Sequence, residues 1–183
     1  MRRHGPWTIH SSQHIYGDAW IDVNKDQVTR PDGKPGTYTT VQLKHGVCVI
    51  ALDEQQQVHL TREFHYAVGR VTLEGVSGGI EADESPELAA ARELAEELGL
   101  TAARWTRLSQ VDPFTAAIDS TVDLYLAQQL NQCPTAHEGT EQIEHVVMPL
   151  AEAIELVRQS HITHAPTCVA LLRNALDGYG NKE

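Results

Sequence analysis

The 183-residue sequence contains few cysteines and no long apolar run. Its three cysteines, Cys48, Cys133 and Cys168, are far apart and form no CxxC pair, so they indicate neither a disulfide scaffold nor a zinc site. No segment approaches the roughly 18 apolar residues that a membrane span needs. Two arginines follow the first methionine, but the apolar segment of a signal peptide does not come after them. We therefore expect a cytoplasmic protein with free thiols and no membrane partner.

Basic residues are also scarce. Lysine and arginine total 14 against 25 aspartates and glutamates, which gives a formal net charge of −11. A broad nucleic-acid interface needs lysines and arginines that face phosphates, so this composition argues against a nucleic-acid partner. It still permits a phosphorylated substrate, provided that a divalent metal supplies the positive charge. The length fits one domain, or one domain with a small appendage.

The sequence patterns predict a mixed α/β fold, with many strands, one central helix and two closing helices. The central helix has Ser85 as its N-cap, Pro86 in its first turn and Gly99 as its C-terminal stop. The glycine-rich fingerprint of dinucleotide-binding folds does not occur. The predicted strands are residues 7–12, 15–30, 37–43, 46–53, 58–66, 69–80 (breaking into a loop), 104–112, 120–130 and 141–150, and the closing helices are residues 150–159 and 166–176.

The central helix carries an acidic cluster of Glu93, Glu96 and Glu97. At 100° per residue, this cluster is predicted to lie nearly opposite the apolar stripe of the helix. Like charges one turn apart repel, so the cluster is either an ordinary solvated face or the binding site of a cation. Hard cations such as Mg²⁺ and Mn²⁺ prefer oxygen ligands of this kind. The predicted apolar stripe consists of Leu88, Ala91, Leu94, Ala95 and Leu98.

The residues before the helix complete a longer pattern. A glycine is followed after five residues by a glutamate, after seven more by an arginine, and then directly by the remainder of "RELAEELGL". This pattern resembles the Nudix box, and each of its defined positions is filled. The resemblance implies an α/β/α sandwich and a hydrolase of nucleoside diphosphates linked to another group, with Mg²⁺ or Mn²⁺ as cofactor. The matching residues are Gly78, Glu84, Arg92, Glu93, Leu94, Glu96, Glu97, Gly99 and Leu100.

The same resemblance assigns roles to individual residues. Arg92 is expected to orient a carboxylate of the box, and Glu84 to close the loop onto the helix or hold water at the metal. Gly78 lets the loop backbone approach the metal closely. A carboxylate elsewhere accepts the proton of the attacking water. The implied metal ligands are Glu93 and Glu97, Glu96 as a ligand or a near neighbour of one, and the backbone carbonyl of Ser77.

Segments outside the box resemble the ADP-ribose pyrophosphatase branch of the family. Residues 1–42 resemble its N-terminal strand region, which implies a dimerisation element and a homodimer, and residues 43–183 form the expected hydrolase domain. In the segment before the box, His65 stands where this branch often has a phosphate-contacting arginine. The loop Glu74–Gly78 lacks the branch's proline. The expected fold is therefore a Nudix sandwich with an N-terminal antiparallel β region.

Further candidates follow from this resemblance. The catalytic base is expected on a late loop, with Glu141 first and Glu138 second. Arg62 and Arg70 either meet phosphates or form ordinary salt bridges, and Phe114 lies near the nucleotide or packs in the core. The remaining candidates are His65 and Glu74 for substrate, the pair His161 and His164 for metal or for a surface loop, and Trp20, Tyr38 and Tyr66 for base stacking or the dimer interface.

The expected reaction is hydrolysis of the pyrophosphate bond of ADP-ribose to AMP and ribose 5-phosphate. One alternative is another substrate, such as GDP-mannose, ADP-glucose, FAD or a coenzyme A derivative. A second alternative is a non-catalytic Nudix domain that senses a ligand. The complete set of Glu93, Glu96 and Glu97 argues against the sensor, because a sensor does not need the metal ligands.

Overall fold

The computed structural model describes residues 1–136 and 142–178 of the chain. Two compact units can be distinguished. The first contains Met1–His45 and the insert Phe114–Ser120, and the second contains Gly46–Pro113 and the described residues from Thr121 onward. Across the two described segments, no helix has both the length and the apolar character that a membrane span requires.

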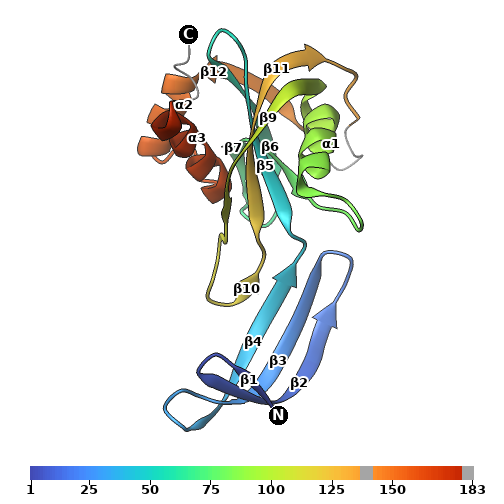
Figure 1. Cartoon of the computed structure of the whole chain (residues 1–183), viewed down its shortest axis with the longest axis vertical. Coiled ribbons are helices and arrows are strands. Elements are labelled where there is room, and N and C mark those ends of the chain that lie inside the picture. The colour runs from blue at the N-terminus through green and yellow to red at the C-terminus, as the bar shows by residue number, and fades with distance from the viewer. Residues whose placement is uncertain (137–141, 179–183) are drawn as a thin grey trace. The chain divides into compact units, whose positions relative to one another are not determined.

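The first unit is a sheet with the strand order β1-β2-β3-β4-β10 (Figure 1). Neighbouring strands are antiparallel, except that β10 runs parallel to β4. Ile9 and Val28 face each other in register and are buried, whereas most of the other side chains in these strands reach solvent. The strands are β1 (Arg2–His4), β2 (Trp7–Gly17), β3 (Ile21–Thr29), β4 (Pro35–Leu43) and β10 (Ile118–Asp119).

The predicted strand over residues 15–30 is wrong, because a turn divides it. The Asp18 carboxylate accepts hydrogen bonds from the backbone N–H groups of Trp20 and Ile21, at 2.8 and 2.9 Å. This side chain satisfies the backbone groups at the turn and lets the chain reverse between β2 and β3. The missed signal was therefore a single aspartate within an otherwise strand-like segment.

The second unit is built around a sheet with the strand order β12-β6-β5-β11-β9. Strand β11 runs parallel to β5, and the other neighbours in this order are antiparallel. Two short strands join it, with β7 pairing β6 and β8 pairing β5. The strands are β5 (Gly46–Leu52), β6 (Gln57–His65), β7 (Arg70–Glu74), β8 (Val76–Gly79), β9 (Leu100–Val111), β11 (Val122–Gln132) and β12 (Glu144–Pro149).

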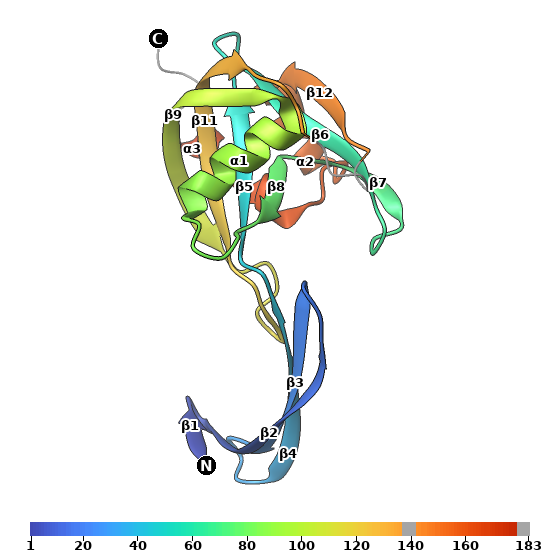
Figure 2. The same cartoon turned by 90° about the vertical axis from the view of Figure 1, so that its right-hand side faces the viewer.

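Helices cover both faces of this second sheet. Helix α1 (Pro86–Leu98) lies on one face, and α2 (Leu150–Arg158) and α3 (Ala165–Asp177) lie on the other (Figure 2). Side chains of β5 alternate between the two cores. Val47, Val49 and Ala51 pack with α1, and Cys48, Ile50 and Leu52 pack in the core that includes residues of α3. The predicted α/β/α sandwich is confirmed, and a strand buried on both faces explains the continuous apolar run of β5.

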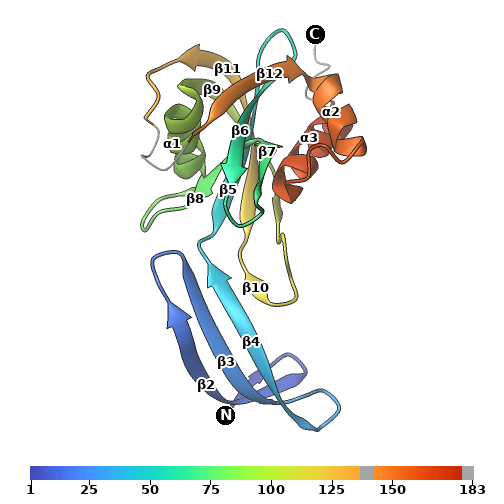
Figure 3. The ribbon, with the colours of Figure 1, turned by 180° about the vertical axis from the view of Figure 1, so that it is seen from behind.

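The predicted strand over residues 69–80 is two strands that separate at Gly75. Strands β5 and β6 pair only at Ala51–His59 and Leu52–Val58, and then diverge. Beyond that point β7 continues along β6 and β8 continues along β5 (Figure 3). Gly75 forms the step between them. A Cβ atom at this position would lie 2.8 Å from the carbonyl oxygen of Val49, so the close packing requires glycine.

Candidate functional site

The acidic helix α1 begins and ends as its sequence predicts. The Ser85 hydroxyl accepts a hydrogen bond from the backbone N–H of Leu88 at 3.3 Å, and Pro86 occupies the first turn. At the other end, Gly99 adopts the left-handed conformation with φ of 62°, and its N–H contacts the carbonyl of Ala95. These caps fix the two ends of the helix. They therefore fix where its glutamates lie relative to the strands of the sheet.

The buried face of α1 differs from the predicted apolar stripe. Leu94 and Leu98 are buried as predicted, but Leu88 is 62% exposed. Outside the predicted stripe, Ala90 is fully buried and Glu97 is only 9% exposed. The inward face is turned toward Ala90 and Leu94, and Glu97 lies on this face and not opposite to it. The carboxylates are therefore partly enclosed by protein, and this enclosure strengthens their interactions with a cation.

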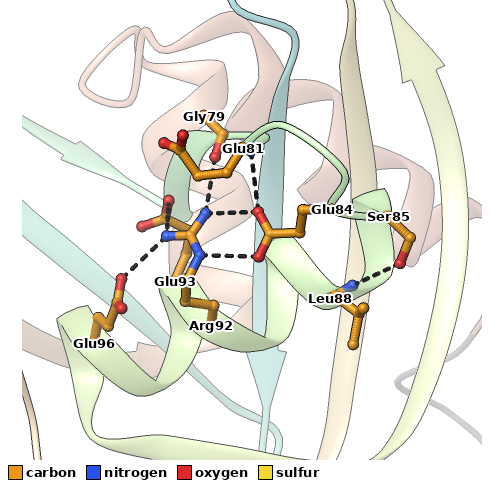
Figure 4. Close-up of polar contacts among 8 residues, drawn as sticks. All are labelled: Gly79, Glu81, Glu84, Ser85, Leu88, Arg92, Glu93 and Glu96. Carbon is orange, nitrogen blue, oxygen red and sulfur yellow. Dashed lines mark hydrogen bonds and ion pairs between the residues drawn. The ribbon is translucent and has the colours of Figure 1, made fainter.

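Arg92 contacts the carboxylates of Glu84, Glu93 and Glu96 from the middle of the cluster (Figure 4). Two of its nitrogens lie 3.0 Å from the two oxygens of Glu84, and Nη1 lies 2.7 Å from Glu93 and 3.1 Å from Glu96. Nη2 also donates to the backbone carbonyl of Gly79 at 2.9 Å. One side chain therefore joins the loop before α1 to the helix itself.

Arg92 and the carboxylates of this cluster stabilise one another's charged forms. Hydrogen bonds from Arg92 lower the pKa of Glu84 below its ordinary value of 4.5. The same bonds, that to Glu84 first, raise the pKa of Arg92, so the guanidinium remains charged. Side chains of Glu84 and Glu93 are 15% and 13% exposed, while that of Glu96 is 40% exposed. Glu96 consequently lies at the rim of the cluster.

Gly78 provides the space in which the Glu93 carboxyl group lies. A Cβ atom built on Gly78 would overlap all three atoms of this carboxyl group. Strand β8 thus passes directly beside the helix, and only a glycine at position 78 leaves Glu93 room for this position. The backbone of β8 at Gly78 and the Glu93 carboxyl group of α1 therefore lie side by side. A metal site that combines backbone and carboxylate oxygens needs such an approach.

The oxygen donors here fit a hard divalent cation. Glu93, Glu96 and Glu97 supply carboxylates, and the Ser77 carbonyl lies in the neighbouring strand β8. Within residues 1–136 and 142–178, three or more histidine, cysteine, aspartate or glutamate side chains do not converge with the geometry of a metal centre. Arg92 instead holds Glu93 and Glu96 in the structure as it stands. The metal ligands therefore stay a prediction supported by the donor chemistry.

The substrate candidates form two groups on β6 and β7. Arg62 binds the Glu144 carboxylate of β12 at 3.0 Å, and Arg70 donates to the hydroxyl of Thr163 at 2.9 Å. His65 lies 3.2 Å from the Glu74 carboxylate, and the other oxygen of Glu74 lies 3.1 Å from His164. Burial lowers the pKa of His164, although Glu74 opposes this shift. His164 thus belongs to a polar cluster with Glu74 and does not pair with His161 in that cluster.

The remaining candidates have different surroundings. Phe114 is 56% exposed, so the alternative that it packs in a core is wrong. Tyr66 is 94% exposed in the turn between β6 and β7, and Trp20 is 66% exposed with the Lys44 ammonium 5.1 Å from its ring centroid. Tyr38 packs edge-on against Trp7. Both candidate bases, Glu138 and Glu141, lie outside the described residues.

Thr167 was not predicted from the sequence. It is fully buried on α3, and its hydroxyl accepts a hydrogen bond from the backbone N–H of Gly75 at 2.8 Å. A nitrogen of His164 lies 2.8 Å from the same hydroxyl. A threonine in the first turn of a helix is an ordinary sequence feature, and only the tertiary structure reveals its contact with Gly75.

Comparison with known proteins identifies the family. A family model described as the NUDIX domain matches residues 42–168, which is more than half of the chain. The chain belongs to the Nudix family. A second model, described as the nucleoside diphosphate sugar hydrolase N-terminal domain, matches residues 7–41 of this Nudix protein.

Individual relatives cover nearly the whole chain. An ADP-ribose pyrophosphatase of Mycobacterium tuberculosis is 31% identical over 94% of this chain and 84% of the relative. An ADP-ribose pyrophosphatase of Bacillus subtilis is 27% identical over 88% of each chain. A crystal structure described as an ADP compounds hydrolase superposes with a TM-score of 0.84 over 98% of both chains, at 22% identity. This last likeness shows that the fold is shared.

Proposed function

We propose that this Nudix protein hydrolyses the pyrophosphate bond of a nucleoside diphosphate sugar, with ADP-ribose giving AMP and ribose 5-phosphate. The observation that carries the proposal is the cluster in which Arg92 holds Glu84, Glu93 and Glu96 beside Gly78. Mg²⁺ or Mn²⁺ is the proposed cofactor. The names of the two ADP-ribose pyrophosphatases support this substrate, as does the match of residues 7–41 to a nucleoside diphosphate sugar hydrolase domain.

The side chains have complementary tasks in this reaction. When bound at the cluster, a divalent ion would supply positive charge against the pyrophosphate and would lower the pKa of a bound water. Glu93 and Glu97 would hold the ion, with Glu96 at the rim and the Ser77 carbonyl of β8 as a further ligand. Arg92 keeps Glu93 and Glu96 in place through hydrogen bonds of 2.7 and 3.1 Å.

Proton transfer is assigned to the late loop. The glutamate that accepts the proton of the attacking water is Glu141, with Glu138 as the second choice. Such a base must come within hydrogen-bond reach of the water. Ala136, which precedes both candidate bases in the chain, donates its backbone N–H to the carbonyl of Glu96 on α1 at 3.0 Å. This anchor supports the assignment of the base to the loop.

The substrate's phosphates and sugar are assigned to β6 and its neighbours. Arg62, His65 and Arg70 are the proposed phosphate contacts, and Glu74 is the proposed acceptor for sugar hydroxyls. His65 already lies 3.2 Å from Glu74, so the two side chains present a donor and an acceptor side by side. Phe114 is exposed and available to contact a nucleobase.

A panel of substrates tests the proposal. Phosphate-coupled turnover is measured with ADP-ribose, ADP-glucose, GDP-mannose, FAD, NADH, coenzyme A and diadenosine polyphosphates, each with Mg²⁺. A preference for ADP-ribose by kcat/KM is the expected result. A preference for another compound of the panel would identify a different Nudix substrate and contradict the choice of ADP-ribose. If ligands raise the melting temperature of the protein but none of them is hydrolysed, the result would contradict the proposed enzymatic activity and favour a ligand sensor.

We also propose that residues 1–42 form a dimerisation element, that residues 43–183 form the hydrolase domain, and that the protein acts in the cytoplasm. The first unit exposes Ile15, Tyr16 and Trp20 at 50%, 52% and 66%, which leaves apolar surface for a second copy of the chain to cover. The three cysteines are free thiols, which suits a reducing compartment. Sedimentation of a dimer of about 40 kDa, twice 20.2 kDa, is expected. A stable monomer at micromolar concentration would contradict the dimer.

A further inference from the structure

The step from β7 to β8 leaves a backbone group that the sheet does not pair. Strands β5 and β6 diverge after two paired positions, and Gly75 lies where the chain moves from one strand to the other. A buried N–H group at such a step needs a partner from elsewhere, because water does not reach it. The adjoining Val76 is fully buried, and Cys48 and Val49 of β5 close the space around Gly75.

Helix α3 supplies this partner. The Thr167 hydroxyl accepts the Gly75 N–H at 2.8 Å, and its side chain is fully buried. Two further groups surround the same hydroxyl: a His164 ring nitrogen at 2.8 Å and the Cys48 sulfur at 3.7 Å. The hydroxyl is therefore held from several sides and has little freedom to turn away from Gly75.

The position of Gly75 determines where β8 lies, and β8 leads to the proposed metal-binding residues. Strand β8 starts one residue after Gly75 and pairs with β5 through Val76–Val49, Ser77–Cys48 and Gly78–Val47. The Ser77 hydroxyl also donates to the carbonyl of Gly75 at 2.8 Å. Three residues after Gly75, the Gly78 backbone lies against the Glu93 carboxyl group. A small displacement of β8 therefore moves the Ser77 backbone and changes the space beside Gly78 in which the Glu93 carboxyl group lies.

From these contacts we infer that Thr167 is a positioning residue for the metal site. It acts from the opposite face of the sheet by fixing β8 through the Gly75 N–H. This inference rests on the proposed function, because it assigns the Ser77 carbonyl and Glu93 to the metal. It adds a residue outside the Nudix box, on a helix that the box does not include.

Two variants isolate the hydroxyl, and a third serves as a control. Thr167→Val keeps the shape of the side chain and removes the hydroxyl, whereas Thr167→Ser keeps the hydroxyl and removes a methyl group. Leu171→Ala is the matched control, since Leu171 is fully buried on the same helix and belongs to the core that lies on that face. Each purified full-length variant is compared with wild type by melting temperature without metal, by Mn²⁺ affinity and by exchange of the Gly75 amide in glycine-labelled NMR samples.

In Thr167→Val, we expect Gly75 amide exchange at least about tenfold faster than in wild type, and Mn²⁺ affinity weaker by about 10- to 100-fold, the range for residues that orient metal ligands. Thr167→Ser should restore both values, and Leu171→Ala should lower the melting temperature while leaving Mn²⁺ affinity within about twofold. Unchanged Mn²⁺ affinity in Thr167→Val, or the same loss in Leu171→Ala, would overturn the inference. Absence of Mn²⁺ binding by wild type would overturn it too.

Failure of the proposed substrate is distinguishable from failure of this inference. If wild type binds Mn²⁺ and hydrolyses none of the nucleoside diphosphate sugars, the proposed reaction is refuted. The exchange and affinity measurements still decide the role of Thr167, because neither depends on turnover. If wild type is active and Thr167→Val keeps its Mn²⁺ affinity, the reaction stands and the positioning role is refuted.

Discussion

Replacing Gly78 with alanine tests whether the approach of β8 to α1 builds the metal site. The new Cβ atom would occupy the space of the Glu93 carboxyl group. Ordinary contacts to a Cβ atom begin at 3.4 Å, so this carboxyl group must move by more than about 1 Å. The movement also breaks the 2.7 Å hydrogen bond between Arg92 and Glu93.

Two effects of different size are expected. The end of the Glu93 side chain is flexible and partly exposed, so loss of its hydrogen bond should reduce the free energy of unfolding by only about 1–2 kcal/mol. A misplacement of about 1 Å at a catalytic group can cost about 100-fold in rate. Gly78→Ala should therefore lower kcat about 100-fold and raise the Mg²⁺ concentration for half-maximal rate, while the protein stays folded.

The assay combines turnover at increasing Mg²⁺ with urea unfolding. Gly36→Ala is a suitable control, since a Cβ atom there would lie 3.0 Å from the flexible Arg30 side chain in the first unit, outside the metal-binding cluster. This control should leave the Mg²⁺ dependence unchanged. Wild-type kcat and Mg²⁺ dependence in Gly78→Ala would refute the account of the cluster.

Three further predictions concern other members of the site. Glu97→Gln should abolish turnover while circular dichroism stays native, and near wild-type activity would remove Glu97 from the metal ligands. Glu141→Gln should lower kcat by about 10²–10⁴-fold; if Glu138→Gln has that effect in a steady-state assay instead, the assigned base is wrong. Because hydrogen bonds from Arg92 lower the pKa of Glu84, this carboxylate contributes stability above pH 4.5 that is lost as pH falls through its lower folded-state pKa. Urea unfolding of Glu84→Gln should lack that contribution, and an unchanged pH dependence would argue against it.

Much of the fold follows from local sequence patterns. The apolar run of β5 predicted a strand, and Ser85, Pro86 and Gly99 predicted the ends of α1. These features depend on neighbours in the chain, which a sequence displays directly. The resemblance to the Nudix box implied that Arg92 orients a carboxylate of the box and that Glu84 closes the loop onto the helix.

Features decided by tertiary packing were harder to predict. The predicted apolar stripe of α1 was only partly correct: Leu94 and Leu98 are buried, but Leu88 is exposed and Glu97 is buried. An ideal helical wheel assumes that apolar side chains face the core, whereas here small alanines do so and leave room for a carboxylate. The contact of Thr167 with Gly75 joins residues 92 positions apart, so no local pattern contains it.

Hydrolysis of ADP-ribose under controlled metal tests the central claim most directly. Purified protein is incubated with ADP-ribose in Mg²⁺, in EDTA, and in EDTA followed by excess Mg²⁺, and the products are separated by chromatography. We predict AMP and ribose 5-phosphate in equal amounts with Mg²⁺, no products in EDTA, and recovery on addition of Mg²⁺. Equal rates of product formation in all three conditions, or no cleavage in any of them, would contradict the proposed metal-dependent hydrolysis.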